Sequence, residues 1–125
     1  MTLEHINESA ENYLETILVL SKSLSTVRSI DVVHALGFKK SSVSVAMKNL
    51  REAGHIVMDD NGHIHLTESG HAIAEMVFER HELLTTWLTH LGVPEDIASE
   101  DACKLEHVLS KESFTAIKMH AQQHK

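Results

Sequence analysis

The fold is indicated most clearly by residues 29–66, SIDVVHALGFKKSSVSVAMKNLREAGHIVMDDNGHIHL. Ser29 favours a helix N-terminus and Gly37 favours a helix end, so a short helix is predicted between them. After a turn, a further helix is predicted to begin at Ser41 or Ser42, because serine is a good N-cap. Two helices joined by so short a turn are typical of a helix-turn-helix.

The pattern changes after Gly54, which is predicted to end that helix. The stretches 55–58 and 63–66 carry Ile and Val and flank Asp59–Gly62, whose Asn-Gly pair is a strong hairpin signal. Upstream, residues 8–22 have apolar side chains at spacings of three and four, which predicts a helix. The order of three helices and a hairpin is that of a winged helix-turn-helix.

The second half of the chain is predicted to be helical. Thr67 can cap a long helix that runs to about Leu91, and Pro94 then suits a first helical turn. That next helix is expected to reach about Leu109 with an interruption near Ser99, and a last helix to run from Ser110 to about Gln123. We therefore expect a mainly α protein, with a winged helix-turn-helix DNA-binding domain at 1–70 and a helical metal-binding and dimerisation domain at 71–125.

Composition narrows the class of protein. The 125 residues include 11 Lys and Arg against 18 Asp and Glu, a net charge of −7 that argues against coating nucleic acid by bulk charge. No apolar run approaches the roughly 20 residues that span a bilayer, and the first residues do not resemble a secretory signal. The single cysteine, Cys103, cannot form an internal disulfide. A cytoplasmic protein without a membrane partner is expected.

A local basic region supports DNA binding. Between Gly37 and Ala53 there are four basic residues and only one acidic residue, Glu52, for a local charge of +3. The alternative is a solvated lysine edge on a plain helical core. The acidic hairpin tip, Asp59 and Asp60, should be repelled by phosphate, so we expect the wing to contribute little and a dimer to span two half-sites. The residues expected to contact DNA are Lys39, Lys40, Ser41, Ser42, Ser44 and Lys48.

Metal chemistry is suggested by Cys103, Glu106 and His107. On a helix these positions share one face, where thiolate, carboxylate and imidazole suit a divalent transition metal. His81 on the long helix, with Asn12 and Glu15 on the first helix, could complete the ligand shell. In the alternative interpretation the cysteine is a small core residue, Glu106 and His107 are surface residues, and His81 is a hydrogen-bonded core histidine.

Five segments of the chain match a known family in the same order along the sequence: Ser9–Ile17, Ser41–Ser44, Leu66–Gly70, Arg80–Leu84 and Cys103–His107. Together they resemble the diphtheria toxin repressor/manganese transport regulator family of metal-dependent transcriptional repressors. The resemblance covers about residues 8–115 and implies a winged-helix domain, a helical dimerisation domain and a divalent corepressor metal at their junction.

The resemblance implies that Glu106, His107 and His81 are metal ligands and that Cys103 stands at a ligand position. A cysteine there is similar to the iron-responsive branch, and thiolate favours Fe²⁺, Co²⁺, Ni²⁺ or Zn²⁺ over Mn²⁺. Glu15 matches a carboxylate of the manganese branch, whereas Asn12 stands where the family has Asp or Met.

The chain also departs from the iron branch at its second, ancillary metal site. Thr85 and Ser99 occupy positions where that branch has ligands, so the ancillary site is expected to be absent or rebuilt from Glu82, Glu100 or Asp101.

These observations together predict an Fe²⁺-dependent repressor that binds a palindromic operator as a homodimer and controls metal homeostasis genes. Trp87, Leu88 and Leu91 are the expected dimer interface, with plain core packing as the alternative. A manganese- or zinc-responsive regulator, a winged-helix dimer without metal and a sensor of another signal such as pH remain open. An enzyme is not expected, because no residue is evident to orient a catalytic base, and no small organic ligand is implied.

Overall fold

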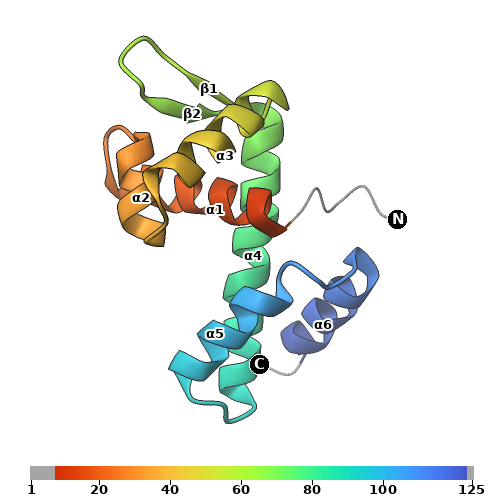
Figure 1. Cartoon of the computed structure of the whole chain (residues 1–125). Coiled ribbons are helices and arrows are strands. Elements are labelled where there is room, and N and C mark those ends of the chain that lie inside the picture. The colour runs from red at the N-terminus through yellow and green to blue at the C-terminus, as the bar shows by residue number, and fades with distance from the viewer. Residues whose placement is uncertain (1–7, 124–125) are drawn as a thin grey trace. The chain divides into compact units, whose positions relative to one another are not determined.

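The computed structural model describes residues 8–123. The first seven residues of the expected DNA-binding domain and the last two of the expected dimerisation domain lie outside the described part. Within it, the chain divides into two compact units, with the division between Glu75 and Met76. The first unit contains three helices and a two-stranded antiparallel sheet (Figure 1). Its elements are α1 (Glu8–Ser23), α2 (Ser29–Leu36), α3 (Lys40–Glu52), β1 (Ile56–Met58) and β2 (Ile64–Leu66). This is the expected winged helix-turn-helix.

The core of the first unit is built from the apolar stripes that the sequence predicts. Leu14 and Ile17 of α1 are almost completely buried, as are the inward-facing residues of α2 and α3. One side chain of each strand also enters this core, which follows from the alternation of side chains along a strand. The other buried residues that contribute are Val32, Val43, Met47, Leu50, Ile56 and Ile64.

Two of the predicted helix starts differ from the observed ones. Arg28, and not Ser29, is the N-cap of α2, where its backbone N–H donates to the Asp31 carboxylate at 2.8 Å. Lys39 is the N-cap of α3 and makes no side-chain capping bond, so Ser41 lies inside the first turn instead of before it. The serines are thereby left on the helix surface. Gly37 ends α2 as predicted, with a φ of 70°.

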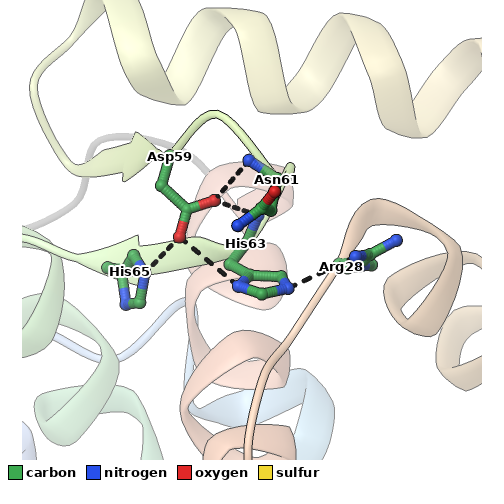
Figure 2. A network of polar contacts seen from close by, with 5 residues as sticks. All are labelled: Arg28, Asp59, Asn61, His63 and His65. Atoms are coloured by element: carbon green, nitrogen blue, oxygen red, sulfur yellow. Dashed lines mark hydrogen bonds and ion pairs between the residues drawn. The ribbon is translucent and has the colours of Figure 1, made fainter.

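The wing is organised by Asp59. One carboxylate oxygen accepts the backbone N–H groups of Asn61 and His63 at 2.9 and 3.0 Å, and these bonds lower the pKa of Asp59. Figure 2 shows the other oxygen between the His63 and His65 rings, at 3.4 Å from each. The Arg28 guanidinium lies on the far side of His63, 3.3 Å from Nε2. Asp59 therefore stabilises the turn, in addition to carrying the negative charge from which the sequence predicted repulsion.

The helix α4 (Glu68–His90) begins in the first unit and continues into the second. Thr67 caps it as predicted, because its hydroxyl accepts the Gly70 N–H at 3.3 Å. Gly70 lies so close to the His55 carbonyl that a Cβ at this position would overlap the oxygen. This contact joins the start of α4 to the residue before β1.

The second unit adds α5 (Glu95–Leu105) and α6 (Lys111–Gln123) to the rest of α4. α5 is not interrupted at Ser99, contrary to the prediction, and it ends earlier than Leu109. The last helix was predicted to run from Ser110, and α6 begins one residue later, where the Ser110 hydroxyl accepts the Ser113 N–H at 3.0 Å. Among the described residues, none of the helices has the length and apolar character needed to cross a membrane.

Candidate metal centre and DNA-binding surface

Glu106 is the centre of a buried polar cluster in the second unit. It follows the last residue of α5, and its side chain is 0% exposed. The His81 ring approaches one carboxylate oxygen, with Nδ1 3.1 Å from Oε2. The His107 ring lies on the other side, with Nε2 3.3 Å from Oε1. A carboxylate is thus held between two imidazoles from different segments.

The Glu106 Oε1 atom is buried without a hydrogen-bond partner among the described residues. His107 Nε2 is near it, but the geometry of that approach does not make a hydrogen bond. A buried carboxylate oxygen in this condition is costly unless a donor or a cation compensates it. Two imidazoles and a carboxylate are the usual ligands of a divalent transition metal, so these residues fit such an ion.

Arg80 fixes the backbone that carries Glu106. Its side chain is only 2% exposed, and Nη1 donates to the carbonyls of Glu106 and Leu109 at 3.2 and 2.7 Å. The guanidinium also lies over the Phe114 ring, 5.1 Å from its centroid. One buried cation therefore ties the end of α5 and the following turn to α4.

Ser99 and Thr85 occupy the two positions at which this sequence departs from the ancillary metal site of the iron branch. Ser99 Oγ lies 3.4 Å from His81 Nε2, the ring nitrogen that faces away from Glu106. Thr85 Oγ1 is buried without a hydrogen-bond partner among the described atoms.

The structure brings together only part of the predicted ligand set. Glu106 lies against both His81 and His107, whereas Cys103 is exposed on α5. Within the described residues, neither Cys103 nor His107 belongs to a group of three possible ligands whose atoms all lie within 4.8 Å of one another. Asn12 and Glu15 are half-buried on α1, in the first unit.

The predicted DNA contacts form an exposed surface on α3. All six residues are exposed, and Val45, on the same helix, is also 60% exposed. A hollow of about 490 Å³ lies beside them, lined from α1 by Ser9 and Tyr13 and from α3 by Ser41, Ser42, Val45, Ala46 and Asn49. Burial raises the pKa of Tyr13, which favours the neutral phenol at this surface.

A groove of about 730 Å³ lies between α4 and α6 in the second unit. Trp87 and Leu91, two of the expected interface residues, line it together with Leu83. Leu88 is half-buried and does not line this groove.

Besides Glu106 and His107, the structure buries two charged residues within its described part, Arg80 and Glu11, which are adjacent in sequence to His81 and Asn12. The sequence analysis assigned no role to either of them. Arg80 could have been found, because it falls between Val77 and Leu84 on the apolar face of α4, where a charged side chain needs buried partners. Glu11 is completely buried next to Asn12, but no sequence pattern marked it.

Comparison with known proteins identifies the family of both parts of the chain. Residues 5–64 match the model of the iron dependent repressor N-terminal DNA binding domain, and residues 67–124 match the iron dependent repressor metal binding and dimerisation domain. The chain belongs to the iron-dependent repressor family. The resemblance noted in the sequence is confirmed, and the family consists of metal-dependent transcriptional repressors.

Relatives within the iron-dependent repressor family align along almost the whole chain. The transcriptional regulator MntR of Escherichia coli O6:H1 is 32% identical over 120 residues, which are 96% of this chain and 77% of that protein. An uncharacterised helix-turn-helix transcriptional regulator of Methanocaldococcus jannaschii is 32% identical over 122 residues, 96% of this chain and 98% of the relative.

A solved structure is also similar. A manganese-dependent transcriptional repressor in complex with manganese superimposes with a TM-score of 0.83 at 29% identity, over 90% of this chain and 52% of the other. The chain therefore spans about half the length of that repressor.

Proposed function

We propose that this protein is a manganese-responsive repressor, which binds a palindromic operator as a homodimer and controls metal homeostasis genes. The observation that carries the proposal is the buried Glu106 carboxylate between His81 and His107, with one oxygen that lacks a hydrogen-bond partner among the described residues. The exposed basic helix α3 supplies the DNA-binding part of the proposal.

The proposed ligands are His81, Glu106 and His107 from the second unit, with Glu15 and Asn12 from α1. A divalent ion would compensate the negative charge of the buried Glu106 carboxylate. Because α1 belongs to the DNA-binding unit, ligands from both units would couple metal binding to the placement of the recognition helices. A coupling of about 1–3 kcal/mol corresponds to roughly 5–150-fold control of operator affinity.

The choice of Mn²⁺ rests on the names of the similar regulators and of the solved repressor, which favour manganese for this chain. The donor atoms are compatible with Mn²⁺, because carboxylate oxygen suits that ion, and imidazole suits Fe²⁺ and Zn²⁺ as well. The softer thiolate of Cys103 is exposed and is not among the proposed ligands. Fe²⁺, which the sequence predicted, is the second candidate, because Cys103 stands at a ligand position of the iron branch.

The test measures operator affinity under anaerobic conditions at one fixed salt concentration, because phosphate contacts make affinity salt-dependent. The probe is a duplex selected from random sequence by the metal-loaded protein. Affinity is compared without metal and with Mn²⁺, Fe²⁺ or Zn²⁺ at equal free concentrations. We expect the largest increase with Mn²⁺; a larger increase with Fe²⁺ would favour the second candidate, and no increase with any metal would contradict both.

Variants locate the response. Glu106→Gln should abolish the metal-dependent increase, whereas Glu112→Gln, the same change at an exposed position of α6, should retain it. Cys103→Ser should leave activation by Mn²⁺ unchanged. A loss of activation in Cys103→Ser would instead show that the thiol is a ligand.

A further inference from the structure

Val45 is an exposed apolar side chain on the proposed DNA-binding surface of α3. It is 60% exposed, although the same helix buries three other apolar side chains almost completely. Those three, Val43, Met47 and Leu50, form the face of α3 that enters the core of the first unit. Successive residues of a helix are turned by about 100°, so Val45, two positions from both Val43 and Met47, points away from that face.

The residues around Val45 suit the close approach of a DNA groove. Ser41 lies one turn before Val45 and Asn49 lies one turn after it, and both border the hollow between α1 and α3. Their side chains are short, so they leave the helix free to come near another surface. Lys40 and Lys48 are exposed on the same helix and carry charge that attracts phosphate. An isolated exposed valine is ordinary, but this one lies in the middle of a polar and basic helix surface.

The major groove offers one apolar group to such a side chain. Every base pair presents hydrogen-bond donors or acceptors there, and among the four ordinary bases thymine alone adds a C5-methyl group. Valine can neither donate nor accept a hydrogen bond through its side chain. Against the polar edge of another base it would displace water without replacing the lost hydrogen bonds, which is unfavourable. Contact with the thymine methyl group has no such cost and buries apolar surface on both molecules.

We propose that Val45 is a specificity-determining residue, which contacts the C5-methyl group of one thymine in each operator half-site. The inference rests on the proposed function, because it requires that α3 enters the major groove of an operator. It adds a property of the operator, namely a thymine at one fixed position of each half-site. The branched Cβ of valine restricts its χ1 rotamers in a helix, so the contact is held at one place in the groove.

The experiment removes the methyl group from the DNA and the side chain from the protein, separately and together. The probe is the duplex selected by the metal-loaded wild type, in which each symmetry-related pair of thymines is replaced in turn by deoxyuridine. Deoxyuridine lacks only the C5-methyl group of thymidine, so base pairing and charge are unchanged. At one pair we expect affinity to fall about 4-fold for each half-site, which is the value of one buried methyl group. Salt and free metal are held constant throughout.

Variants of the protein assign the effect to Val45. In Val45→Ala the same replacement in the DNA should change affinity by less than about twofold, because the methyl group has already lost its partner. A duplex reselected by Val45→Ala should no longer require thymine at that pair. Val19→Ala shortens a valine that is 44% exposed on α1, and it should retain the full loss. Both variants should keep the metal-dependent increase in affinity, because neither residue is a proposed ligand.

Two results would overturn the inference while the proposed function stands. Either no pair of thymines is weakened by deoxyuridine in the wild type, or Val45→Ala shows a loss as large as the wild type does. Failure of the proposed function is distinguishable. In that case the metal-loaded wild type selects no duplex from random sequence, or binds the selected duplex no more tightly than a shuffled one, and the role of Val45 is overturned with it.

Discussion

Arg80 shows how a single residue supports the proposed centre without being a ligand. Its guanidinium is buried, donates to two carbonyls beyond the end of α5 and lies over Phe114. Those carbonyls have left the helix, so the side chain replaces the helical hydrogen bonds that they would otherwise accept. Glu106 is therefore presented by a backbone that Arg80 fixes.

Replacing Arg80 with Met should lower the free energy of unfolding of the metal-free protein by about 2–6 kcal/mol, because two carbonyls lose a donor at roughly 1–3 kcal/mol each. Denaturant unfolding measures the change. Arg51→Met removes an exposed arginine and serves as the control, with little expected effect. A loss as small in Arg80→Met as in the control would contradict this role.

Gly70, in the first turns of α4, packs directly against the backbone just before strand β1 of the wing. An alanine inside a helix usually stabilises it by about 0.5–1 kcal/mol relative to glycine. Here the new Cβ would overlap the His55 carbonyl oxygen, which is backbone and cannot turn aside. We expect Gly70→Ala to destabilise the protein by about 1–3 kcal/mol, measured by thermal unfolding, whereas His71→Ala at the neighbouring exposed position should not. Stabilisation by Gly70→Ala would contradict the close approach.

At the scale of elements, the wing has a pH-dependent component. Because the pKa of Asp59 is lowered in the folded chain, its carboxylate stabilises the folded turn above the ordinary carboxyl pKa of about 3.9. That contribution is lost as the pH falls through the lowered pKa. The protection of the Asn61 and His63 amides, measured as the intrinsic exchange rate divided by the observed rate at each pH, should therefore fall below about pH 4. In Asp59→Asn this protection should already be lower at neutral pH and should lose its dependence on pH in the acid range.

The elements also show what sequence could predict. The helices of the first unit, the hairpin, and the Thr67 and Ser110 caps follow from local spacing and side-chain chemistry. The predicted N-caps of α2 and α3 were wrong. Arg28 and Lys39 occupy the N-cap positions, although neither residue type is a favoured cap.

The candidate site was also only partly predictable. Spacing alone put Cys103 on one face with Glu106 and His107. Glu106 keeps a helical backbone, with its N–H bonded to the Ala102 carbonyl, whereas His107 lies in the turn after α5, so helical spacing does not hold for His107. The contacts of His81 with Glu106 and Ser99 join segments distant in sequence, so no local pattern contains them.

At the scale of the whole molecule, the proposed homodimer has a candidate surface in the groove between α4 and α6. Trp87→Glu should produce a monomer in sedimentation experiments, because a carboxylate would be buried in an apolar contact. Operator affinity should then fall by an order of magnitude or more, since two half-sites would no longer be bound together. Val108→Glu, at a residue 68% exposed in the same unit, is the control. A dimeric Trp87→Glu protein would place the interface elsewhere.

The buried Glu106 oxygen, which has no hydrogen-bond partner among the residues that the structure describes, has a consequence for the lifetime of the protein in a cell. A ligand that binds only the folded chain stabilises it by about 2.7 kcal/mol at a concentration 100 times its dissociation constant. Shifts of about 1–2 kcal/mol can change cellular abundance several-fold, because chaperones and proteases act on the unfolded fraction. A metal that compensates this oxygen would thus slow degradation of the chain, and metal starvation would reduce both the activity of each molecule and the number of molecules that remain.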